Sequence, residues 1–308
     1  MPRFVRIKPT SLPVAAFFMA ATLSYGVQAM GISPGVIVIG NVTPGVEVPA
    51  FPADGTGIKV ENDGDNPLVV TLTVFKPTLG GVLRWEKGYE EIPDASWCSL
   101  GKTELEAPAK GFALAKLSIK VPDKPEYYNR KWMVAVVCEP KRQDRKAGTG
   151  IAMRVASRIG IETLPKVDVN LDAPGLPALS LVPSLLSYDG CILGETFPAT
   201  LKIRNNDKAQ HTYMAERLDQ AEPDAEKQTR YFRASSNRIV KDWWVAPVES
   251  FKLGAAETKE LKLSVTVPKT AAAGQVYEEI VFLKDDAQRY DFFRLRMRVA
   301  GSAEAPKK

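Results

Sequence analysis

An internal repeat constrains the fold of this chain more than any other feature of its sequence. The segment LAKLSIKVP at residues 114–122 returns as ELKLSVTVP at residues 260–268. In both copies apolar and polar residues alternate, which is the period of a β-strand with one buried face and one wet face. The proline that ends each copy closes the strand, because proline cannot donate a hydrogen bond to a neighbouring strand. The repeat therefore predicts two similar β modules.

The repeat extends beyond these two segments at a nearly constant spacing. Val121 lies 146 residues before Val267, and Asn62 lies 143 residues before Asn205, each within a similar local pattern. A nearly constant offset across separate strands indicates an internal duplication.

Runs of β-branched and apolar residues recur through both halves of the chain, at residues 36–42, 68–75 and 131–138 in the first half. The last of these is apolar on both faces, which indicates a central strand. We predict an all-β fold of two tandem immunoglobulin-like β-sandwiches. The predicted boundaries are residues 30–165 and 177–301 for the sandwiches, 166–176 for a proline-rich linker and 302–308 for a flexible tail.

The first 29 residues have the layout of a secretory signal peptide. Arg3, Arg6 and Lys8 precede an uncharged apolar run at residues 12–23, and the small residue Ala29 follows. A buried helix or an uncleaved anchor is the alternative, but the run is shorter than the roughly 20 residues that span a bilayer. We expect cleavage after Ala29, export to the periplasm or the cell surface, and no stable membrane span after cleavage.

Charge and motif content argue against nucleic-acid binding and catalysis. The chain has 41 basic and 36 acidic residues, and removing three basic signal residues leaves 38 against 36, a weak balance for a nucleic-acid protein. His211 is the single histidine, and no nucleotide-binding, serine-hydrolase or zinc-protease motif occurs. We therefore expect no enzyme activity, no catalytic residues, no cofactor, no metal and no nucleic-acid partner.

Two aromatic features are candidates for ligand binding. Trp243 and Trp244 are adjacent, so on a strand one ring points inward and the other outward. An outward Trp244 could stack on a sugar or anchor a protein, or it could lie under the polar insertion at residues 219–241. That insertion is either a solvated loop or a recognition loop, and its candidate binding residues are Tyr231, Phe232 and Arg233.

The sequence contains three cysteines and does not decide whether two of them form a disulfide. Cys98 and Cys138 fall in the first module and Cys191 in the second. A disulfide between Cys98 and Cys138 would close a loop of about 40 residues. The alternative is that all three are small buried hydrophobic residues.

The segments VPDKPEYYNRKWMVAV at 121–136 and VPKTAAAGQVYEEIVF at 267–282 carry a family resemblance. They resemble the immunoglobulin-like modules of bacterial exported proteins, in the fibronectin-like and major-sperm-protein-like group that includes WxL-interacting surface proteins. The resemblance implies non-catalytic roles in adhesion, wall binding or surface assembly. The order of elements is also faintly similar to periplasmic pilus chaperones, which hold a subunit's carboxylate with a basic pair that no motif places on this chain.

These observations favour a structural or protein-interaction module at the cell surface or in the periplasm. Its expected partner is another envelope or surface protein. Two alternatives stay open: a chaperone for surface-appendage subunits, and a module that binds cell-wall glycan.

Overall fold

The structure is a computed structural model that describes residues 30–81, 86–141, 153–167, 172, 176–232, 237–238 and 250–301. The expected signal peptide, most of the expected linker and most of the expected tail lie outside these residues. Within the described part of the chain, no helix has the length and apolar character that a membrane crossing needs.

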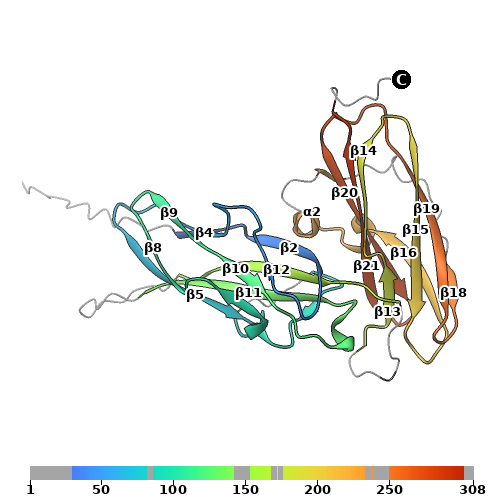
Figure 1. Ribbon diagram of the computed structural model, residues 1–308, viewed down its shortest axis with the longest axis horizontal. Coiled ribbons are helices and arrows are strands. Elements are labelled where there is room, and N and C mark those ends of the chain that lie inside the picture. The colour runs from blue at the N-terminus through green and yellow to red at the C-terminus, as the bar shows by residue number, and fades with distance from the viewer. Residues whose placement is uncertain are drawn as a thin grey trace, which may run out of the picture.

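The first module is a β-sandwich of two layers (Figure 1). One layer has the strand order β2-β12-β11-β5-β8, with β6 beside β11, and the facing layer consists of the short sheets β1-β4-β9 and β3-β10-β7. The strands are β1 (Met30–Ser33), β2 (Val36–Val42), β3 (Val48–Pro49), β4 (Ile58–Asn62), β5 (Leu68–Phe75), β6 (Glu90–Glu91), β7 (Cys98–Leu100), β8 (Glu104–Ala107), β9 (Gly111–Ala115), β10 (Leu117–Ile119), β11 (Lys131–Pro140) and β12 (Val155–Thr163), with 3-10 turns η1 (Ala95–Trp97) and η2 (Pro125–Tyr127).

The second module repeats this plan and stands across the end of the first (Figure 1). Its layers have the orders β13-β15-β19 and β14-β21-β20-β16-β18, with β17 beside β20. Its elements are β13 (Leu179–Val182), β14 (Leu185–Cys191), β15 (Thr196–Asn205), β16 (His211–Arg217), α1 (Leu218–Ala221), α2 (Ala225–Gln228), η3 (Thr229–Tyr231), β17 (Asn237–Arg238), β18 (Phe251–Leu253), β19 (Thr258–Thr266), β20 (Val276–Asp285) and β21 (Tyr290–Val299). The predicted all-β, two-sandwich fold class is confirmed.

The opening strand of each module changes layers at a proline. In the first module β1 pairs with β4 in one layer and β2 pairs in parallel with β12 in the other, with Pro34 between them. In the second module β13 pairs with β15 and β14 pairs in parallel with β21, with Pro183 between them. Proline has no N–H to donate, so the ladder breaks at that point in both modules.

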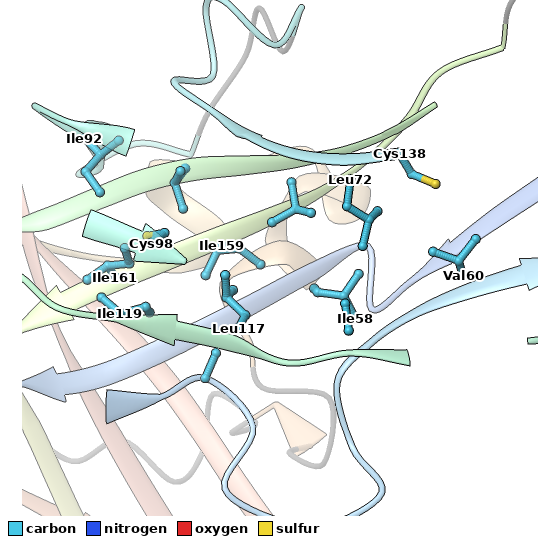
Figure 2. Close-up of a cluster of buried hydrophobic side chains, with 14 of the residues drawn as sticks. Ile58, Val60, Leu72, Ile92, Cys98, Leu117, Ile119, Cys138, Ile159 and Ile161 are labelled. Atoms are coloured by element: carbon cyan, nitrogen blue, oxygen red, sulfur yellow. The ribbon is translucent and has the colours of Figure 1, made fainter. Parts of the chain in front are cut away.

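The alternation of the repeated segment matches the observed burial. Leu117 and Ile119 are buried in the core of the first module (Figure 2), as is Ala115, and Leu263 and Val265 are buried in the core of the second. The two copies differ in continuity, because the first is divided into β9 and β10 at Lys116, whereas residues 260–266 of the second form one uninterrupted stretch of β19. β9 pairs with β4, and β10 pairs with β3 and β7, so the two halves belong to different sheets.

One buried asparagine in each module stabilises the turn that follows its strand. Asn62 is the last residue of β4, and Asn205 is the last residue of β15. The Asn62 side-chain oxygen accepts from the Gly64 backbone N–H at 2.9 Å, and the Asn205 oxygen accepts from the Asp207 N–H at 2.9 Å. The side-chain nitrogen of each lies within hydrogen-bond distance of three carbonyl oxygens. The repeated asparagines therefore satisfy backbone groups at matching places in the two modules.

The three cysteines are buried free thiols, so the Cys98 to Cys138 disulfide that the sequence left open is not formed in this structure. Figure 2 shows Cys98 near Ile161 at one end of the core and Cys138 beside Leu72 at the other. The Cys138 sulfur instead lies 3.7 Å from the sulfur of Met30. Burial raises the pKa of both thiols to about 12, so neither is activated as a nucleophile.

Candidate binding cleft

The polar insertion of the second module contributes to an apolar core between the two sandwiches. Leu218 and Ala221 in α1 and Tyr231 in η3 are buried against Tyr89 and Met133 of the first module. The same cluster includes side chains from the strands β20 and β21, namely Ile280, Phe282 and Phe292. The interpretation of this insertion as only a solvated loop is therefore wrong, because Ala221 and Tyr231 within it pack between the modules.

A buried charge network lies beside this core. Arg294 of β21 is fully buried, and its guanidinium is 2.7 Å from a carboxylate oxygen of Glu162 in β12 and 3.0 Å from one of Glu278 in β20. The Tyr89 hydroxyl donates to Glu162 at 2.6 Å and accepts from Arg294 at 3.1 Å. A second buried ion pair across the junction joins Lys131 to Asp291.

The network keeps its charges although it is buried. Burial acts to raise the pKa of Glu162, but the charges of Arg294 and Lys131, together with the hydrogen bonds from Arg294 and Tyr89, hold that pKa below its ordinary value. Burial likewise acts against the charge on Arg294, whereas Glu162 and Tyr89 hold the guanidinium pKa above its ordinary value. Paired buried charges with several hydrogen bonds fix geometry, since any displacement leaves a charge unpaired.

A cleft with a volume of about 810 Å³ opens between the sandwiches next to this junction. The first module contributes Lys87, Tyr89 and Lys131 to its walls, among others. The second module contributes Asn206, Tyr213, Arg289 and Tyr290, among others. Since both modules line the cleft, its shape depends on the junction described above.

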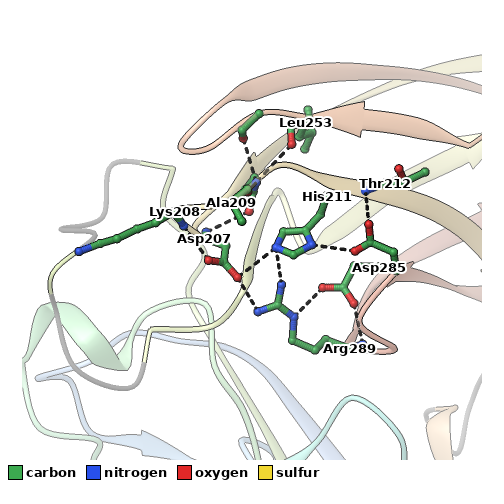
Figure 3. Close-up of polar contacts among 11 residues, drawn as sticks. Asp207, Lys208, Ala209, His211, Thr212, Leu253, Asp285 and Arg289 are labelled. Atoms are coloured by element: carbon green, nitrogen blue, oxygen red, sulfur yellow. Dashed lines mark hydrogen bonds and ion pairs between the residues drawn. The ribbon is translucent and has the colours of Figure 1, made fainter.

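His211 lies in an ion-pair cluster at the second-module wall of the cleft (Figure 3). Its ring nitrogens are 2.7 Å from a carboxylate oxygen of Asp286 and 3.1 Å from one of Asp207. Arg289 is 2.8 Å from Asp207 and 2.6 Å from Asp285. The hydrogen bond with Asp286 raises the pKa of His211, and the hydrogen bond from Arg289 lowers the pKa of Asp207 to about 2.

This cluster includes a set of groups that could hold a metal ion. His211, Asp285 and Asp286 each offer one ligand atom, and these atoms lie within 4.8 Å of one another. The Arg289 guanidinium already supplies positive charge to Asp285 and contacts the same histidine. We therefore treat the group as an ion-pair cluster.

The candidate binding residues from the sequence have different outcomes. Tyr231 is fully buried, and its hydroxyl donates to the Lys87 carbonyl at 3.3 Å, so it belongs to the junction and presents no surface to a ligand. Phe232 is partly buried against the same core. Trp244 and Arg233 lie outside the described residues, and their roles stay predictions.

Sequence reasoning missed the residues that form the junction. The run FFRLRM of β21 contains two arginines, of which Arg294, between Phe293 and Leu295, is fully buried and Arg296 is partly buried. Charge at a buried strand position is the one sequence signal that could have indicated it, because such a residue needs a partner.

Comparisons with known proteins show solved structures with a similar fold but do not assign the chain to a family. No family model matches the chain, and no curated protein matches its sequence. Among solved structures, it is similar to a protein of unknown function from Porphyromonas gingivalis W83 (13% identity, TM-score 0.33, covering 88% of this chain and 99% of that one). It is also similar to the class 5 fimbriae chaperone CfaA (10% identity, TM-score 0.31, covering 87% and 99%). A third is the Caenorhabditis elegans MSP family member WR4 (9% identity, TM-score 0.25, covering 44% and 98%).

These similar structures include a pilus-type chaperone and a member of the MSP family, the two groups that the sequence resembles. Likeness at these TM-scores carries no argument about function. The fold itself defines the class: an all-β protein of two immunoglobulin-like sandwiches joined by a buried junction.

Proposed function

We propose that this chain is an exported, non-catalytic binding protein of the cell envelope. In this proposal the cleft between the sandwiches holds a segment of another envelope or surface protein. The observation that supports it is a cleft with walls from both modules, beside a junction of buried aromatic rings and paired charges. A site whose walls are already held in place loses little conformational entropy when it binds.

The cleft has the size and lining of a recognition site. Its volume of about 810 Å³ falls within the range of roughly 300–1,000 Å³ that is usual for ligand pockets. Tyr89, Tyr213 and Tyr290 are among its lining residues, and tyrosine is enriched where proteins bind one another.

A second candidate function is a chaperone for surface-appendage subunits, and one feature of β12 favours it. Val155–Ser157, at the start of β12, pairs with β11 on one side, whereas the ladder to β2 on the other side begins at Arg158. Among the described residues, no strand pairs with Val155 and Ala156 on that side, whereas Ser157 is fully buried and its hydroxyl donates to the Pro34 carbonyl. An open edge can accept an extended segment of another chain. The glycan-binding alternative depends on Trp244 and stays a prediction.

Site-specific photo-crosslinking in the native envelope tests the proposed function. A benzophenone amino acid at Lys208, an exposed residue of the cleft wall, should give an adduct with another envelope protein. The same substitution at Asp65, exposed on a turn outside the cleft, should give none. Absence of an adduct at Lys208, or the same adduct at both positions, would overturn the proposal.

Export is tested separately by the mass of the protein recovered from the envelope. A mature chain that begins at Met30 is expected from cleavage after Ala29. Recovery of the uncut chain from the cytoplasm would contradict export.

A further inference from the structure

Glu86 is a buried carboxyl group at the junction, outside the charge network around Arg294. It lies in the loop before β6 and is 5% exposed. One of its oxygens is 2.8 Å from the Arg158 guanidinium and 3.9 Å from that of Arg230. Its other oxygen is buried and has no hydrogen-bond partner among the described residues. Arg158 is therefore the one side chain in the described part of the chain that lies within hydrogen-bond distance of this carboxyl group.

Glu162, another buried carboxyl group of the junction, has a different set of donors. Its two oxygens lie 2.7 Å to 3.0 Å from guanidinium nitrogens of Arg294, and the Tyr89 hydroxyl donates to one of them at 2.6 Å. Donors to both oxygens stabilise the ionised form of a buried carboxyl group. Glu86 has an oxygen with no donor, so its burial favours the neutral acid.

The electrostatics of the two ion pairs agree with this difference in geometry. Burial raises the pKa of Glu86, and the attraction of Arg158 does not offset it. Burial also lowers the pKa of Arg158, although Glu86 lies beside it. Both partners are thus shifted toward their neutral forms, whereas Glu162 and Arg294 are both shifted toward their charged forms. The two pairs should therefore respond to pH in opposite directions.

The groups that face Glu86 come from both modules. Arg158 belongs to β12 of the first module, whereas Arg230 and Tyr231 belong to η3 in the insertion of the second. Glu222, directly after α1 in the same insertion, repels the ionised form of Glu86. Protonation of Glu86 removes both this repulsion and the cost of burying a charge. A change of charge on Glu86 therefore acts where the insertion contacts the first module.

We propose that Glu86 is a pH-dependent switch between the two modules, in which the neutral acid strengthens the contact with the insertion and the ionised form weakens it. A group that binds its proton more tightly when buried adds stability that is fully present below its unfolded titration midpoint. That stability is lost as the pH rises through the folded midpoint. The insertion should therefore be held more firmly in mildly acidic medium than at neutral pH. Lys87 and Tyr89 line the cleft, so the switch also acts on the cleft wall, whatever ligand binds there.

A carbon-13 NMR titration of the glutamate carboxyl groups in the mature chain tests the switch directly. The Glu86 signal is identified by its loss in Glu86→Gln, and its midpoint should lie above the ordinary glutamate value of about 4.3. The midpoint should return toward that value when a short glycine–serine connection replaces residues 219–231 and the first-module signals stay those of the wild type, because the burial is then removed. A wild-type midpoint at or below the ordinary value, or one that the replacement leaves unchanged, would overturn the proposal.

Urea unfolding at several pH values gives a second measurement. Glutamine does not titrate, so the wild-type midpoint should fall relative to that of Glu86→Gln as the pH rises from about 3.5 to about 7. The matched control is Glu91→Gln in β6. Thr78 donates to Glu91 through its hydroxyl and its backbone N–H and lowers the pKa of that carboxyl, so the wild type should gain stability relative to this variant as the pH rises. A Glu86 difference that does not change with pH, or that changes in the same direction as the Glu91 difference, would contradict the switch.

Discussion

At the scale of single residues, Arg294 is the residue that we expect to contribute most to holding the two modules together. It is fully buried and contacts carboxylates from both sandwiches, at 2.7 Å from Glu162 and 3.0 Å from Glu278. We expect Arg294→Leu to lower the free energy of unfolding by about 3–5 kcal/mol, because both carboxylates stay buried without a cation. Urea unfolding of the full chain measures this change.

Arg298→Leu is the matched control on the same strand. Arg298 pairs with Asp189 at 3.2 Å, and both side chains are at least half exposed. Exposed pairs contribute about 0–1 kcal/mol, so this variant should unfold close to the wild-type midpoint. Equal effects of the two variants would show that the buried network does not stabilise the junction.

His211 makes the stability of the folded protein depend on pH, and the direction of this dependence can be stated. The ring faces Asp286, Asp207 and Arg289, and the hydrogen bond with Asp286 raises its pKa in the folded state. A raised pKa adds stability that is fully present below the unfolded value of about 6.5 and is lost as the pH rises through the folded value. In urea titrations from about pH 6 to pH 8, the stability difference between the wild type and His211→Gln should therefore shrink as the pH rises. A difference that grows with pH would contradict this assignment.

At the scale of elements, the loop before β6 approaches the second module so closely that it needs glycine. Gly88 has a φ of +79°, and a Cβ there would lie 2.7 Å from the Cδ1 atom of Phe292. Gly81 has the same φ of +79°, with no atom within 4 Å of its Cβ position. Comparing alanine substitutions at the two glycines therefore distinguishes the cost of backbone strain from the cost of a steric clash across the junction.

We expect Gly81→Ala to cost about 1–2 kcal/mol of unfolding free energy from left-handed backbone strain alone. Gly88→Ala should cost about 1–3 kcal/mol more, because its methyl group would also displace the Phe292 ring. Chemical denaturation of both variants measures the difference. Equal losses would mean that the loop can move away from the second module at no cost.

At the scale of the whole molecule, the junction should make the two sandwiches unfold together. Leu218, Ala221 and Tyr231 bury apolar surface against the first module, next to two ion pairs that cross the junction. We expect one calorimetric transition for the full chain. Replacing residues 219–231 with a short glycine–serine connection should split that transition or lower its midpoint by at least about 5 °C, since buried apolar contacts are lost. A single unshifted transition would show that the insertion is only a surface loop.

The local pattern of the chain predicted several of its strands. The expected strands at 36–42 and 68–75 are β2 and β5 with the same bounds, and the strand expected at 131–138 lies within β11. Side-chain alternation and turn residues act over a few positions, so they can be read directly from the sequence. The break at Lys116 could not, because it depends on which sheet each half of the segment joins.

The sequence by itself determined that this protein has two similar β modules, because the duplicated pattern of buried positions and closing prolines is local to each half. Only the tertiary structure decided how the modules meet. Glu162 and Arg294 lie 132 positions apart in the chain, and no local periodicity relates them. The same holds for the cleft, whose walls come from residues as distant in the chain as Tyr89 and Arg289. Whether a buried charge stabilises the fold depends on such long-range contacts, because its partners come from strands that are distant in the chain.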